Sequence, residues 1–147
     1  MDVVVSSATF SGSAEAFIGF CRSLDSRRCW PGAALSMATP DALYYMVSMR
    51  LKSATMTDID IEERIGPLEQ TPEGVRFGTT QRCTWPDGLA LGETEYRFEG
   101  NSLTFTYRYE PPTTKLVKTK DLPKFHDGME HVAARYLAGL TSAFVPR

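Results

Sequence analysis

The sequence predicts a single α+β domain in which a curved antiparallel sheet packs against one long C-terminal helix. Between residues 43 and 109, several segments alternate apolar and polar residues with a period of two, as strands do when one face of a sheet is buried. From residue 123 onward the apolar residues recur every three or four positions, which is typical of one side of a helix. The chain has 147 residues, a length that suits one domain.

The composition is that of a soluble globular protein. Hydrophobic residues make up 42% of the chain, charged residues 23%, and the formal net charge is −2, so no global charge attracts the protein to nucleic acid or to an anionic membrane. No segment approaches the roughly 18 apolar residues of a membrane span, and the N-terminus lacks the pattern of a signal peptide. We therefore expect a cytoplasmic protein.

Three cysteines are present, Cys21, Cys29 and Cys83. Their odd number and the lack of a CxxC spacing argue against a disulfide framework and against a zinc site. We expect buried or half-buried thiols, and neither a metal nor a cofactor.

The first third of the chain predicts one strand, short helical segments and a second strand. Residues 1–10 are rich in β-branched side chains and predict a strand. Residues 11–24 predict a short amphipathic helix with Ser13 as its N-cap. Residues 25–32 can form one more helical turn before a Pro-Gly pair, and residues 33–39 predict a weak strand.

The middle of the chain predicts a run of strands joined by turn-like segments. Glu63 interrupts the apolar face of one of them, and it is the one carboxylate that strand phase turns inward. A bulge near Gly66 would turn it outward again. The predicted strands cover residues 43–51, 57–65, 74–83, 92–99 and 103–109.

Residues 123–144 predict the one helix long enough to cover this sheet. Phe125, Met129, Val132 and Tyr136 form its apolar stripe. A single helix is only about 10 Å wide, whereas a twisted sheet of six or seven strands is wider. The remaining concave surface must be filled by side chains or left as a cavity.

The order of these elements resembles the helix-grip fold of the START-related SRPBCC superfamily. The opening segment, SSATFSGSAEAFIGFCRSLDSRRCWPG, is similar to that superfamily's first strand, short helix and Trp-Pro turn, with matching positions at Phe17, Leu24, Trp30, Pro31 and Gly32. The superfamily includes lipid-transfer domains, plant pollen-allergen-like proteins and polyketide cyclase/dehydrase families. The resemblance implies one START-like domain over residues 1–147, with a sheet of six to seven strands around the helix and one or two short helices after the first strand. It also implies an apolar or amphipathic small molecule between sheet and helix.

Several inward-facing residues carry hydroxyl or amide groups, which supports such a cavity. A core without a cavity would favour Leu, Ile and Val over Tyr, Thr and Gln. Alternatively, these hydroxyls bond to one another across strands. The residues expected to face the ligand are Tyr45, Val47, Met49, Phe77, Thr79, Gln81, Tyr96, Phe98, Phe105, Tyr107, Tyr109, Met129, Val132 and Tyr136.

Few residues suggest catalysis. His126 and His131 lie off the apolar stripe of the last helix, so we expect them at the surface. Glu63 is the candidate acid or base, and no nucleophile arrangement or phosphate-binding loop is present. We therefore favour binding or transport of a hydrophobic small molecule, such as a lipid or a polyketide-like compound. The alternatives are an enzyme resembling polyketide cyclases or aromatases, and a non-catalytic interaction module filled by its own side chains.

Four lysines, Lys115, Lys118, Lys120 and Lys124, surround the start of the last helix. Such a run is usually a solvated loop. It can also make a transient contact with an anionic head group, a membrane surface or a partner at the cavity mouth. A nucleic-acid interface would need more basic residues interleaved with aromatic ones.

Overall fold

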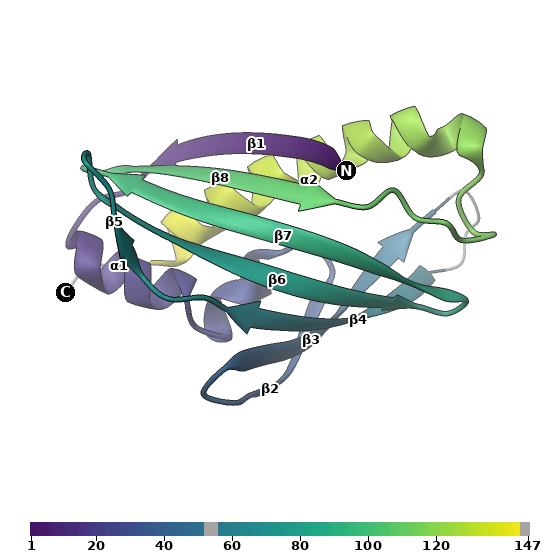
Figure 1. The fold of residues 1–147 in the computed structure, drawn as a ribbon, viewed down its shortest axis with the longest axis horizontal. Coiled ribbons are helices and arrows are strands. Elements are labelled where there is room, and N and C mark those ends of the chain that lie inside the picture. Colours follow the sequence, from purple (N-terminus) through teal and green to yellow (C-terminus); the bar gives the residue numbers. More distant parts are fainter. Residues whose placement is uncertain (52–55, 145–147) are drawn as a thin grey trace.

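A computed structural model describes residues 1–51 and 56–144. Strands contain more of the described residues than helices do, and the helices lie near both ends of the chain (Figure 1). The elements in order are β1 (Asp2–Thr9), α1 (Ala14–Cys21), η1 (Asp25–Cys29), β2 (Ala33–Ala38), β3 (Ala42–Arg50), β4 (Met56–Ile65), β5 (Glu69–Gln70), β6 (Val75–Trp85), β7 (Gly88–Glu99), β8 (Ser102–Tyr109), η2 (Thr119–Asp121) and α2 (Leu122–Ala143).

The strands form one antiparallel sheet in the order β1-β8-β7-β6-β4-β3-β2, with β5 paired to β6. The first strand, β1, pairs with the last, β8, so that β1 and β2 are the two edge strands of this order. Both α-helices lie on the same side of this curved sheet, and α2 packs against β1, η1 and β8 (Figure 1). The predicted α+β helix-grip architecture is confirmed.

The alternating pattern determines which face of each strand is buried. Leu43, Tyr45 and Val47 of β3 point toward the helices and are buried. Glu63 of β4 also points inward and pairs with Gln81 of β6. The register continues to the end of β4 without a bulge, so the inward phase predicted for Glu63 is confirmed.

Two details differ from the predicted elements. Strand β5 has only two residues, both exposed, too few to produce an alternating pattern. The hairpin of β6 and β7 is longer than predicted, because pairing continues from Trp85 to Gly88 around the turn. Leu89 and Leu91 on its β7 side are apolar but exposed, so this part of the sequence shows no alternation of buried apolar and exposed polar residues.

Local signals define both α-helices. The Ser13 Oγ accepts a hydrogen bond from the Ala16 N–H at 3.3 Å, so the predicted N-cap of α1 is confirmed. Pro123 occupies the first turn of α2, where no backbone N–H is needed. Among the described helices, none is both long enough and apolar enough to cross a membrane. The buried side of α2 consists of Met129, Ala133, Tyr136, Leu137 and Leu140.

Candidate ligand-binding site

A cavity of about 510 Å³ lies between the first half of α2, the end of β3 and the segment that leads into η2. We call it the outer cavity. Its walls are mainly apolar, and exposed residues such as Leu116 and Met56 lie at its edge. The described lining residues are Trp30, Pro31, Gly32, Ser48, Met49, Arg50, Leu51, Met56, Leu116, Val117, Asp121, Lys124, Phe125, Gly128, Met129 and Val132.

A smaller cavity of about 60 Å³, which we call the inner cavity, lies next to it beneath the sheet. Trp30, Met49, Phe125 and Met129 line both cavities, so these four side chains form the partition between them. Among the polar side chains that line the inner cavity are Tyr45 of β3, Gln81 of β6 and Tyr107 of β8. The other lining residues are Val47, Ile59, Ile61, Cys83, Trp85, Ala90, Tyr109, Glu110 and Pro112.

Three polar residues of the inner cavity form one hydrogen-bonded chain. The Tyr107 hydroxyl donates to the Gln81 Oε1 at 2.8 Å, and the Gln81 Nε2 donates to the Tyr45 hydroxyl oxygen at 3.3 Å. Tyr45 in turn donates to the Glu63 Oε1 at 2.6 Å. The chain therefore connects the cavity wall to a buried carboxylate.

Gly92 leaves room for this chain. It is buried on β7, where a Cβ would lie 2.9 Å from the Tyr107 ring and 3.2 Å from the Gln81 Oε1. Any side chain at this position would displace the hydrogen bond between Tyr107 and Gln81.

The carboxylate at the end of the chain belongs to a fully buried ion pair. The Arg27 Nε donates to the Glu63 Oε1 at 2.8 Å, and the Arg27 Nη2 donates to Oε2 at 3.1 Å. Thr79 also donates to Oε2, at 2.6 Å. Arg27 directs its Nη1 to the Cys21 carbonyl oxygen at 2.7 Å and to two side-chain hydroxyls, those of Ser26 and Tyr136.

These contacts determine the charge state of the pair. Burial acts to raise the pKa of Glu63, but the attraction of Arg27 and the hydrogen bonds from Arg27, Thr79 and Tyr45 outweigh it, so the pKa is lowered. Burial raises the pKa of Tyr45 and of Tyr107 well above the ordinary value. Glu63 is therefore ionised, and both tyrosines keep their protons.

The predicted ligand-facing residues divide into two groups. Tyr45, Val47, Met49, Gln81, Tyr107, Tyr109, Met129 and Val132 line one or both of these cavities. Phe77, Thr79, Tyr96, Phe98, Phe105 and Tyr136 line neither, and they are buried in the core.

The second group packs tightly because the rings stack on one another. The Phe77 and Tyr96 rings are stacked with centroids 4.6 Å apart, and Phe105 contacts Tyr136 with centroids 5.4 Å apart. The Tyr96 and Tyr136 hydroxyls are hydrogen-bonded at 2.7 Å. The expectation that all inward tyrosines face one open space is therefore wrong at this end of the sheet.

Arg27 is the important residue that sequence reasoning missed. It lies on the short η1 segment and has 1% relative exposure. A carboxylate predicted to point into the core requires a cation or several hydrogen-bond donors. This requirement is the one sequence signal that could have indicated a buried partner for Glu63. Nothing in the sequence distinguishes Arg27 from its neighbour Arg28, which is exposed and pairs with Asp25.

The two histidines differ in their surroundings. His131 is exposed, as predicted. His126 is half-buried, with its Nδ1 2.7 Å from the Tyr109 hydroxyl and its Nε2 3.0 Å from the Glu130 carboxylate. Within residues 1–51 and 56–144, no group of His, Cys, Asp and Glu side chains is arranged to hold a metal ion.

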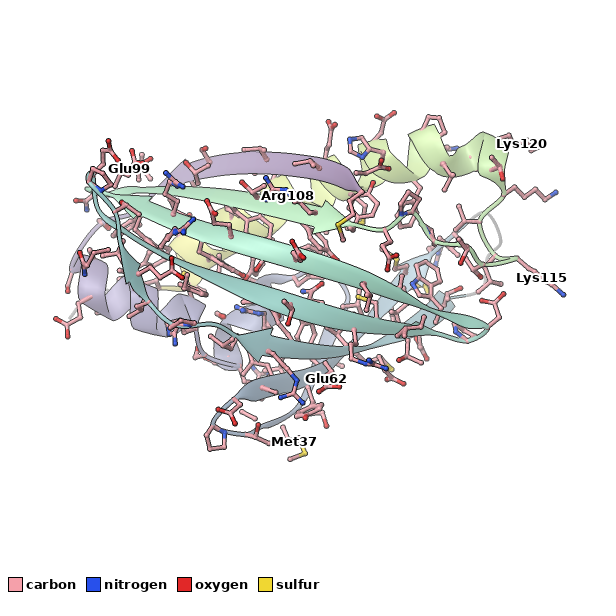
Figure 2. The ribbon with its side chains drawn as sticks, in the orientation of Figure 1. Met37, Glu62, Glu99, Arg108, Lys115 and Lys120 are labelled. Atoms are coloured by element: carbon pink, nitrogen blue, oxygen red, sulfur yellow. The ribbon has the colours of Figure 1, made fainter. Side chains whose placement is uncertain are left out.

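The predicted lysine cluster lies at one end of the molecule. Lys115 and Lys120 extend away from the chain between β8 and α2, far from the hairpin that carries Glu99 (Figure 2). Lys118 is also exposed, and Lys124 lines the outer cavity. The contact of these lysines with an anionic group stays a prediction.

The fold is similar to several solved structures. A conserved protein of Geobacillus kaustophilus has a TM-score of 0.71 at 11% identity, covering 97% of this chain and 94% of that one. A protein of Thermus thermophilus has a TM-score of 0.63 at 13% identity, covering 96% and 95%. The ZhuI aromatase/cyclase of Streptomyces sp. R1128 has a TM-score of 0.60 at 11% identity, covering 97% and 92%.

These similarities define the class of fold. The chain has a helix-grip fold, which it shares with an aromatase/cyclase. The sequence matches no protein-family model and no curated protein.

Proposed function

We propose that the protein binds an apolar or amphipathic small molecule in the outer cavity and its inner extension. The observation that carries this proposal is the outer cavity itself, about 510 Å³ of space with mainly apolar walls and exposed residues at its edge. Small-molecule sites commonly have volumes of about 300–1,000 Å³ and apolar walls with a few polar groups. The inner cavity supplies those polar groups.

Burial of apolar surface supplies the affinity in this proposal. Met49, Met129 and Val132 line the cavity with apolar side chains that a ligand would cover. Methionine side chains adapt to differently shaped partners because they are flexible and polarisable. This lining suits a range of related hydrophobic molecules.

The enzyme alternative finds support in the fold shared with an aromatase/cyclase. The surroundings of Glu63 argue against its use as a general base. Both of its oxygens accept hydrogen bonds from Arg27, Tyr45 and Thr79, and it lines neither cavity. A base must reach the proton that it removes, so we favour binding without turnover by this residue.

A neutral fluorescent probe tests the proposal. N-phenyl-1-naphthylamine should bind saturably and change the fluorescence of Trp30, which lines both cavities. Gly128→Leu should reduce this binding by about tenfold or more, since Gly128 lines the outer cavity, a Cβ there meets no atom within 4 Å, and the larger side chain occupies ligand space.

Gly19→Leu is the matched control. Gly19 is also helical and has open space around it, but it is exposed on α1 and lines neither cavity. Binding should be unchanged in this variant. Absence of saturable binding by the wild-type protein would overturn the proposal and favour the interaction module, and equal loss in both variants would place the site elsewhere.

A further inference from the structure

We propose that the inner cavity selects ligands with a neutral head group that both donates and accepts hydrogen bonds, such as an alcohol or a primary amide, and that it rejects carboxylates. Gln81 and Tyr107 are the residues that select. This inference rests on the proposed binding function and adds the chemical class of the ligand's polar end.

The direction of every hydrogen bond in the chain follows from the buried ion pair. Ionised Glu63 can only accept, so the Tyr45 proton is committed to it at 2.6 Å. The Tyr45 oxygen can then only accept, and the nearby group of Gln81 must be its Nε2. This orients the amide so that the Gln81 Oε1 receives the proton of Tyr107.

The bonding capacity left over defines the head group. The Tyr107 oxygen has donated its proton and keeps free electron pairs, so it accepts from a ligand. The Gln81 Nε2 has a second N–H beyond the one directed to Tyr45, so it donates to a ligand. The Cys83 thiol is a weak donor that interacts with both residues: its Sγ lies 3.8 Å from the Gln81 Oε1, and it also forms a side-chain hydrogen bond with Tyr107.

A carboxylate lacks a cationic partner in the inner cavity. Among the described lining residues the one charged side chain is that of Glu110, which is itself an acid. Arg27 lines neither cavity, and its donors are directed to Glu63, Tyr136, Ser26 and the Cys21 carbonyl. Moving a carboxylate out of water without a cation is costly.

The partition between the two cavities allows entry of a head group. Met49 and Met129 form half of it, and methionine side chains are unbranched and flexible. The inner cavity, at about 60 Å³, has room for a small head group. The apolar body of the ligand would remain in the outer cavity.

Competition against N-phenyl-1-naphthylamine at pH 7 tests the inference with 1-octanol, octanamide and octanoate. The neutral ligands should bind the wild-type protein about tenfold or more tightly than octanoate. Gln81→Met removes both hydrogen-bonding groups and frees the Tyr107 proton for a ligand acceptor. This variant should bind 1-octanol about tenfold more weakly and octanoate no more weakly than the wild type does.

The control Thr94→Val removes a buried hydrogen bond to Thr79 that lies outside both cavities. It should leave the ratio of octanol to octanoate affinities unchanged. If Gln81→Met weakens both ligands equally, or neither, the selectivity is overturned while probe binding still supports the proposed function. If the probe itself does not bind, the proposed function fails first.

Arg27 and Glu63 act here as positioning residues, since neither lines the inner cavity. The double variant Arg27→Met/Glu63→Gln removes both charges and releases the fixed direction of the chain. Probe binding should persist, while the preference for 1-octanol over octanoate falls. A purely structural role would lower the stability of the double variant without changing that preference, and this result would overturn the directional argument.

Discussion

The two ends of the concave sheet surface are built differently. At the end near α1, aromatic and aliphatic side chains such as Phe17, Phe98 and Leu140 pack with no more than 2% relative exposure. We call this the closed end. At the other end, half-buried Met49 and Val132 border the outer cavity. We call this the open end.

Strand β8 passes from one end to the other. Phe105 contacts Tyr96 and Tyr136 in the closed core. Tyr107 and Tyr109, on the same face of the same strand, line the inner cavity. Aromatic residues with the same periodicity therefore serve packing in one place and a binding site in another, depending on which part of α2 lies opposite.

The largest loss in the free energy of unfolding should come from breaking the buried ion pair. Glu63→Gln leaves the Arg27 guanidinium buried without its counter-charge and should lower the free energy of unfolding by about 3–5 kcal/mol. Urea denaturation measures this loss. The double variant Arg27→Met/Glu63→Gln should lose less than the single variant does, and a single variant as stable as wild type would contradict the assigned pairing.

The next largest effect should come from truncating one leucine at each end, because the two truncations should lower the free energy of unfolding by different amounts. Leu140→Ala creates a cavity in the closed core, where Leu140 has 0% relative exposure, and should cost about 2–5 kcal/mol. Leu51→Ala enlarges a space that is already open and should cost about 1 kcal/mol. Equal losses in thermal or urea denaturation would mean that the outer cavity is collapsed in solution.

Acid should affect the ion pair in a defined direction. The folded-state pKa of Glu63 is lowered from its ordinary value of 4.5, so its contribution to stability is present above that value and is lost as pH falls through the folded-state pKa. Unfolding free energies measured between pH 7 and pH 3 should fall more steeply for the wild type than for the double Arg27→Met/Glu63→Gln variant. Parallel curves would contradict the lowered pKa.

The smallest difference should come from the two glycines within α2. Gly128→Ala should raise the free energy of unfolding by about 0.5–1 kcal/mol, because a Cβ there has open space and alanine favours the helix. At Gly139 a Cβ would lie 3.0 Å from the Cys29 Cβ, so Gly139→Ala should gain less. A larger gain at Gly139 than at Gly128 would reverse the comparison of the two ends.

Periodicity along the chain was enough to predict most of the fold. Side chains alternate within each strand whatever the strand packs against, so the inward positions, including that of Glu63, could be read locally. The change of period after residue 123 likewise predicted α2 to within one residue at each end. The helix-grip arrangement was expected from a resemblance in the order of elements, whereas the strand order came from the structure.

Tertiary structure decided which inward residues meet empty space and which residue neutralises Glu63. Arg27 reaches that carboxylate across 36 positions of sequence because η1 packs under the sheet, and no local pattern encodes such a contact. The cavities likewise depend on where one straight helix leaves a wider curved sheet uncovered. That geometry arises only when all strands are assembled, so residues with identical periodicity acquired different surroundings.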